Sequence, residues 1–144
     1  SSSVASDVDK RQTNWYITRA LLGTANSPCK YTAQVLNASL SPFPIPDSRL
    51  ALLCWSRDIT YDETDSSYGD MKQIENNLNL FTDIPILIIW GMLDPVLPIT
   101  VLEKWLSVYP DAPVCKIEDA SHFLQEDTPE RVIREINYFL SSNS

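Results

Sequence analysis

The hydrophobic pattern in the second half of the chain alternates between two types of element. Residues 84–90 form a near-continuous apolar run, which is typical of a strand buried in a parallel sheet. Apolar positions at helical spacing follow over residues 98–109, and a second short strand is predicted over 113–118. Thr128 and Pro129 then predict the start of a last amphipathic helix. The order strand, helix, strand, helix predicts an α/β fold with two neighbouring parallel strands.

The first half has a helical pattern. Helices are predicted over residues 12–22, over 32–40 with Thr32 as N-cap, and over 70–80 with Asp70 as N-cap. These patterns divide the chain into a polar and helical region, residues 1–80, and an α/β segment, residues 81–144.

The connections in the first half differ in composition. The segment SPFPIPD at residues 41–47 holds three prolines and predicts an extended, stiff connection. Residues 48–56 fit either a short helix or an irregular apolar segment, and both interpretations stay open. Residues 61–69 are polar and acidic, which predicts a surface loop.

The charge of the chain excludes some classes of partner. The net charge is −8, from 11 basic and 19 acidic residues. Nucleic-acid and anionic-membrane surfaces are bound through clustered Lys and Arg, so we expect neither partner. No apolar run approaches the ~20 residues that span a bilayer. The start of the chain also lacks the basic and apolar regions of a signal peptide.

The three cysteines, Cys29, Cys54 and Cys115, are odd in number and widely spaced. They fit neither a disulfide framework nor a zinc pattern, which predicts a reducing, cytoplasmic location. The sequence also lacks a metal-ligand cluster and a phosphate-binding glycine loop. We therefore expect no metal and no organic cofactor.

Two side chains with catalytic chemistry follow the predicted strands at the same offset. Asp94 lies four residues after Trp90, and His122 lies four residues after Glu118. Carboxyl ends of parallel strands meet at one edge of a sheet, so we expect these two side chains to lie within hydrogen-bond reach. A carboxylate on one imidazole nitrogen fixes the tautomer while the other nitrogen handles a proton. Isolated Asp and His residues in loops are more often structural, and the matched offsets raise the catalytic interpretation to about even odds.

Two motifs resemble a known family. The stretch IPILIIWGMLDPVLP, residues 84–98, resembles the strand and acid-bearing loop of α/β-hydrolases. The stretch DASHFLQEDTPE, residues 119–130, is similar to their histidine loop. Its residue order is most like that of haloalkane dehalogenases and the related epoxide hydrolases. Upstream, SPFP followed by Ser48 and Arg49 is similar to the end of a dehalogenase cap, a helical lid over the active site. The likeness covers about residues 30–140 and is strongest in the last 60.

The resemblance implies a fold and a set of roles. The fold would be the C-terminal part of an α/β-hydrolase, preceded by a helical cap remnant. Asp94 would be the triad acid, and His122 the base that activates water against an ester formed on a nucleophilic aspartate. Haloalkane dehalogenation is the implied parent activity, with epoxide hydrolysis as the alternative. The family usually has glycine before the histidine, where this chain has Ser121, and a positive φ there would strain the backbone.

The nucleophile is missing from the pattern. The elbow G-x-[S or D]-x-G needs glycines for its strained turn, and Gly23, Gly69 and Gly91 do not form one. A small-molecule substrate is therefore expected only if another hydrolase half completes the site. The alternative is a truncated, non-catalytic homologue that acts by association. Two strands leave an open apolar edge, so we expect self-association or a complementary hydrolase half as partner.

Aromatic side chains are weaker candidates. The indoles of Trp15, Trp55 and Trp105 can donate to a halide, but core packing is the expected role for each. Tyr61 and Tyr68 can polarise an epoxide oxygen, although their polar surroundings favour solvent exposure.

Overall fold

The computed structural model describes residues 14–26, 31–60 and 62–143. Cys29 and Tyr61 lie outside these residues. Contacts divide the described chain into two compact units. The first holds residues 14–21 and 31–77, and the second holds residues 22–26 and 78–143.

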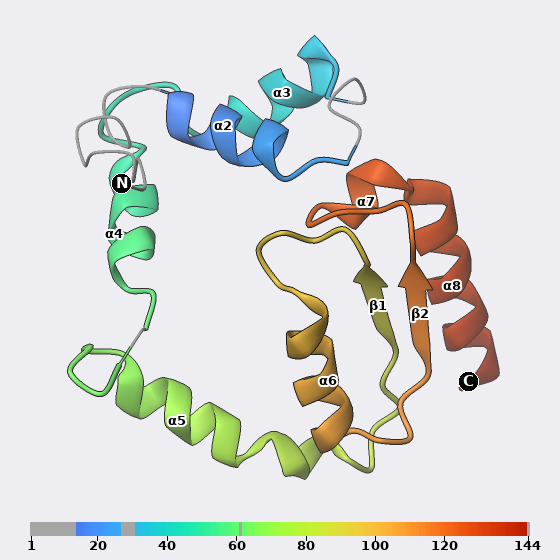
Figure 1. Cartoon of the computed structure of the whole chain (residues 1–144). Helices are drawn as coiled ribbons and strands as arrows, with labels where there is room; N and C mark the ends of the chain where they lie inside the picture. The colour runs from blue at the N-terminus through green and yellow to red at the C-terminus, as the bar shows by residue number, and fades with distance from the viewer. Residues whose placement is uncertain (1–13, 27–30, 61, 144) are drawn as a thin grey trace. The chain divides into compact units, whose positions relative to one another are not determined.

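The first unit is helical (Figure 1). Its helices are α2 (Trp15–Gly23, whose last two residues belong to the second unit), α3 (Ala33–Leu40), α4 (Leu50–Arg57) and α5 (Tyr68–Asn76). Thr32 caps α3 as predicted, since its hydroxyl oxygen accepts a hydrogen bond from the Val35 N–H at 3.3 Å. Residues 48–56, for which a short helix and an irregular segment were both open, contain most of helix α4.

Arg49 anchors the connection before α4. Its side chain is buried, and its Nη1 donates to Asn14 Oδ1 at 3.0 Å and to the Phe43 carbonyl at 2.8 Å.

The sequence predicted an extended connection over residues 41–47, and this prediction is wrong. The segment is folded into turns. The Phe43 N–H donates to the Leu40 carbonyl, and the Arg49 N–H to the Pro46 carbonyl. Proline fixes φ near −65°, a value that suits turns as well as extended chain, so the prolines alone did not decide between them.

The predicted cap of α5 is wrong. The helix begins at Tyr68 with Ser67 at the N-cap position, and Asp70 lies in the first turn. A carboxylate in a first turn is favoured by the helix dipole, which gives the same sequence signal as a cap. A separate 3₁₀ turn, η2 (Leu78–Phe81), follows in the second unit.

The second unit holds the sheet. Strand β1 (Ile88–Gly91) pairs in parallel with β2 (Val114–Ile117), with Ile88 opposite Val114 and Gly91 opposite Ile117. Both arrows in Figure 1 point the same way, and helix α6 (Ile99–Val108) forms the connection between them. Strand β1 is shorter than the predicted 84–90, because a strand is defined by its partner and residues 84–87 lie beyond the reach of β2.

Two helices complete the second unit. They are α7 (Leu124–Asp127), which the sequence did not predict, and α8 (Pro129–Ser142). Thr128 occupies the N-cap position of α8, but its hydroxyl donates to the Leu124 carbonyl at 3.3 Å instead of capping. Leu102 of α6, Ile117 of β2 and Ala120 are fully buried and form the centre of this unit.

The apolar stripe of α8 is only partly covered. Val132 and Phe139 are half-buried, whereas Ile133, Ile136 and Leu140 are exposed by 58%, 41% and 57%. An exposed apolar row of this length on one helix is typical of a surface that contacts another polypeptide.

No helix in the described ranges combines the length and the hydropathy that a membrane span needs.

Candidate functional site

Asp94 lies in the loop that follows β1. Its Oδ1 accepts hydrogen bonds from the backbone N–H groups of Val96, at 2.8 Å, and Leu97, at 2.9 Å. This is the local turn that an Asp side chain forms with the backbone two and three residues on. The turn fixes the orientation of the carboxylate and leaves Oδ2 for another donor.

The histidine loop, residues 118–123, follows β2 and packs directly over the end of β1. The Met92 N–H donates to the Ile117 carbonyl at 2.9 Å, and the Leu93 N–H to the Ala120 carbonyl at 3.0 Å. The Ser121 hydroxyl donates back to the Leu93 carbonyl at 3.2 Å. The two loops are therefore joined by backbone and side-chain bonds just before their catalytic candidates.

Gly91 permits this close packing. A Cβ atom there would lie 2.8 Å from the Ala120 carbonyl oxygen, and closer still to the Ser121 carbonyl oxygen. Any residue other than glycine at this position would push the histidine loop away. The sequence alone does not reveal this requirement for Gly91, because the contact joins it to Ala120 and Ser121, about thirty positions away.

His122 and Asp94 form a direct pair. The His122 Nδ1 lies 2.9 Å from Asp94 Oδ2, and their side chains are 27% and 9% exposed. Since an ionised carboxylate only accepts, the contact selects the tautomer with a proton on Nδ1. The Phe123 ring meets the imidazole edge-on at a centroid distance of 5.0 Å. Nε2 is then the nitrogen that can take a proton from a reactant.

The environment of Asp94 favours its ionised form. Burial raises the pKa of this carboxyl group, but the Leu97 N–H, the His122 ring and the Val96 N–H all donate to it and outweigh that effect. Its pKa therefore lies below the ordinary value of 3.8. A carboxylate in this state can orient an imidazole and stabilise the imidazolium when that ring takes up a proton.

The structure brings together the two residues that the sequence selected, at the distance expected for a hydrogen bond. Their catalytic role stays a prediction. Ser121, which stands where the resembled family has glycine, is accommodated: in the described ranges no residue, glycine included, adopts a positive φ.

The aromatic candidates behave differently from expectation. Trp15 and Trp55 are 50% and 64% exposed, and Trp105 is 39% exposed, so core packing is wrong for all three. Trp105 stacks on Tyr109 at a centroid distance of 6.1 Å. The described residues cover these rings only in part, which hydrophobic spacing cannot reveal. Tyr68 is half-buried at the start of α5.

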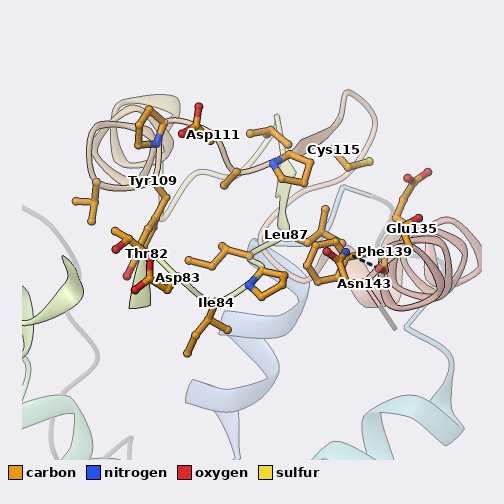
Figure 2. Close-up of a pocket in the computed structure, with 18 of the residues that line it drawn as sticks. Thr82, Asp83, Ile84, Leu87, Tyr109, Asp111, Cys115, Glu135, Phe139 and Asn143 are labelled. Carbon is orange, nitrogen blue, oxygen red and sulfur yellow. Dashed lines mark hydrogen bonds between the residues drawn. The ribbon is translucent and has the colours of Figure 1, made fainter. Parts of the chain in front are cut away.

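A cavity of about 590 Å³ lies at the opposite, amino-terminal end of the two strands. In Figure 2 its wall is formed by Thr82, Asp83, Ile84 and Leu87 before β1, by Glu135 and Phe139 of α8, and by Asn143 directly after that helix. Its lining is mainly apolar and includes Cys115 but neither Asp94 nor His122. We place the candidate site at the polar pair rather than at this hollow. Among the described residues, no group of three or more His, Cys, Asp or Glu side chains is arranged to hold a metal ion.

Curated enzymes are related to this chain in sequence. It is 31% identical over 107 residues to a cis-3-alkyl-4-alkyloxetan-2-one decarboxylase of Shewanella oneidensis, covering 74% of this chain and 34% of that protein. It is 40% identical over 63 residues to epoxide hydrolase 1 of Caenorhabditis elegans, covering 44% and 16%. It is 39% identical over 49 residues to haloalkane dehalogenase 2 of Mycobacterium tuberculosis, covering 33% and 17%. No protein-family profile matches the chain.

A solved structure has a similar fold. The haloalkane dehalogenase DatA from Agrobacterium tumefaciens C58 matches 96% of this chain and 47% of its own, with a TM-score of 0.81 and 24% identity. At this identity the likeness shows the fold. The chain spans about a third of the length of the first curated relatives and about half that of the dehalogenase structure.

Proposed function

The chain carries part of an α/β-hydrolase-superfamily fold, and we propose that it supplies the acid and the base of a hydrolytic triad in an enzyme most like a haloalkane dehalogenase. The observation that carries this proposal is the 2.9 Å contact between His122 Nδ1 and Asp94 Oδ2 beyond the carboxyl ends of two parallel strands. Ligand and catalytic groups gather at this end of such sheets.

The proposed reaction has two steps. A nucleophilic carboxylate attacks the carbon that bears the halogen, halide leaves, and an alkyl ester forms. His122 Nε2 then takes a proton from water while the water oxygen attacks the ester carbonyl. The imidazolium returns that proton to the alkoxide oxygen as it leaves, so the alcohol is released. The carboxylic acid formed, which now holds the oxygen of water, loses its proton to solvent and the carboxylate is restored. Asp94 stabilises the imidazolium during the second step and holds the ring in the Nδ1–H tautomer.

The nucleophile must come from outside these 144 residues. No G-x-[S or D]-x-G motif is present in them, and the described residues contain Asp94 and His122 without a strained nucleophile turn beside them. The purified chain should therefore release no halide above a His122→Ala control. Clear, His122-dependent halide release by the chain alone would contradict this part of the proposal.

A complementary hydrolase half is the partner that fits the open sheet. Among the described residues β1 pairs with β2 and with no third strand, and α8 leaves Ile133, Ile136 and Leu140 exposed beside them. Unpaired strand edges seek backbone partners, and exposed apolar side chains favour burial. Self-association through the same edge is the competing arrangement.

A second candidate reaction is the decarboxylation of a dialkyl oxetan-2-one. The observation that favours it is coverage, because the two decarboxylases so named match 74% and 77% of this chain. Loss of CO₂ from an oxetan-2-one leaves an alkene and consumes no water. Epoxide hydrolysis, which gives a diol, is a third outcome supported by the shorter match.

The test is a chimera in which this chain replaces the matching part of the Agrobacterium dehalogenase. The folded chimera is assayed with a haloalkane, an epoxide and a dialkyl oxetan-2-one, following halide, diol and CO₂. Each assay includes His122→Ala and Asp94→Ala variants. His122-dependent halide release supports the main proposal, and His122-dependent CO₂ release favours the second. A folded chimera without any His122-dependent product would support the non-catalytic alternative, a homologue that acts by association.

A further inference from the structure

Asp127 is a buried carboxylate next to the candidate site. It is the last residue of α7, and 1% of its surface is exposed. Its Oδ2 accepts the backbone N–H of Ser121 at 2.8 Å, and Ser121 directly precedes His122. A carboxylate is costly to bury unless hydrogen bonds compensate it, so its position indicates a specific task.

Asn26 bonds both to the histidine loop and to Asp127. Its backbone N–H lies 3.5 Å from Asp127 Oδ2, and its side-chain Nδ2 donates to the Asp119 carbonyl at 2.6 Å. Asp119 lies in the turn that leads to His122, and Asp127 ends the short helix that follows. One residue from a distant part of the sequence thus contacts the chain on each side of the histidine, at Asp119 before it and at Asp127 after it.

The bonds to the histidine loop come from two directions. Leu93, next to Asp94, bonds the loop through its N–H and its carbonyl oxygen. Asp127 bonds the backbone of Ser121 from the α7 side. If the loop is bonded on one side only, the imidazole ring can change its orientation. Bonds on two sides restrict that motion.

We propose that Asp127 is a positioning residue for His122: by accepting the Ser121 N–H, and with Asn26 completing the clamp, it holds the imidazole against Asp94. This inference rests on the proposed function of the His122–Asp94 pair, but its test does not require turnover. The path of action runs from the Asp127 carboxylate through the Ser121 backbone to the ring. Asp127 itself has no contact with a reacting atom.

His122 is the only histidine in the chain, so its ring is visible without ambiguity. The 144-residue chain is labelled with ¹⁵N-histidine, and the ring nitrogens are followed by NMR at alkaline pH. In the unchanged chain we expect the Nδ1–H tautomer that the contact with Asp94 selects. In Asp127→Ala the ratio of the Nδ1–H to the Nε2–H tautomer should fall roughly two- to tenfold, the range given by the loss of one net hydrogen bond.

Two further variants separate positioning from charge. Asp127→Asn keeps an oxygen that can accept the Ser121 N–H and should restore the ratio. Glu126→Ala removes a neighbouring, exposed carboxylate and should leave the ratio unchanged. Circular dichroism at the same temperature confirms that each variant is folded. A folded Asp127→Ala chain with the unchanged ratio would overturn the proposal.

A measurement on the unchanged chain covers the case in which Asp127→Ala does not fold. Hydrogen exchange of the Ser121 amide and of the His122 ring N–H is compared over a denaturant series. A clamp predicts that both protons lose protection in the same opening. A ring proton that exchanges freely while the Ser121 amide stays protected would overturn the proposal, whatever the chimera shows about activity.

Discussion

The two ends of the β1–β2 sheet differ in what they contain. At the carboxyl end, Met92, Leu93 and Asp94 join the last residue of β2 and the histidine loop through four hydrogen bonds. At the amino end, the segments before each strand surround a mainly apolar cavity of about 590 Å³ (Figure 2). Pro85 and Pro113 line this cavity and have no N–H to donate. The polar side chains therefore lie at the carboxyl end of the parallel strands. At the amino end, the cavity leaves mainly apolar residues open to solvent.

The largest expected effect is on enzymatic activity, which should depend on the carboxyl end of the sheet and not on the amino end. In the folded chimera, His122→Ala should lower halide release by about 10²–10⁴-fold, the usual contribution of a positioned general base. The matched control is Tyr138→Ala, which removes an exposed aromatic ring from the cavity at the amino end. It should leave the rate within about twofold, because surface substitutions away from a site are nearly neutral. Equal losses in both variants would contradict the assignment of chemistry to one end.

The next effect concerns how closely the loops pack at the carboxyl end. Gly91→Ala should lower the free energy of unfolding by about 1–3 kcal/mol, because the added Cβ meets the carbonyl oxygens of Ala120 and Ser121. Urea denaturation of the chain measures the loss, and the NMR signal of His122 reports the displaced loop.

Gly69→Ala is the matched control for this substitution. Gly69 lies in helix α5, and nothing within 4 Å would meet its Cβ. Alanine there should stabilise by up to about 1 kcal/mol, since glycine is the poorer helix former. Equal effects at Gly91 and Gly69 would show that the close approach above β1 does not constrain the loop.

The third effect tests whether the uncovered apolar surface binds polypeptide. Sedimentation over a dilution series should show self-association of the chain, or a complex with a complementary half. Ile136→Lys should weaken it about tenfold, which corresponds to ~1.4 kcal/mol of lost apolar burial. Asn137→Lys adds the same charge at the adjacent exposed position and serves as control. A well-folded monomer at every concentration would mean that the chain covers its own sheet.

The sequence predicted the parts of this molecule that depend on local pattern. The parallel strands follow from two apolar runs, and the sequence placed Asp94 and His122 beyond their carboxyl ends, where the two side chains meet. The predicted equal offsets of four residues are wrong, because β1 ends at Gly91 and β2 at Ile117. The close approach above Gly91 and the bond from Asp127 to Ser121 were not foreseen, because each depends on a tertiary contact. The exposure of Trp105 was missed for a related reason: hydrophobic spacing identifies an apolar helix face but not whether another segment covers it.

The smallest expected effect is on the pH dependence of stability. The pKa of Asp94 is lower in the folded chain than its ordinary value of 3.8. The ionised carboxylate therefore stabilises the fold fully above the unfolded-state pKa, and this contribution is lost as the pH falls through the lowered, folded-state pKa. The effect is small because burial opposes the bonds from Leu97, His122 and Val96. Urea denaturation from pH 6 down to about pH 3 should show the stability advantage of the unchanged chain over Asp94→Asn shrinking below about pH 4. A constant difference across that range would mean that the Asp94 carboxylate has the same proton affinity folded and unfolded, and would contradict the turn and the His122 contact as stabilising bonds.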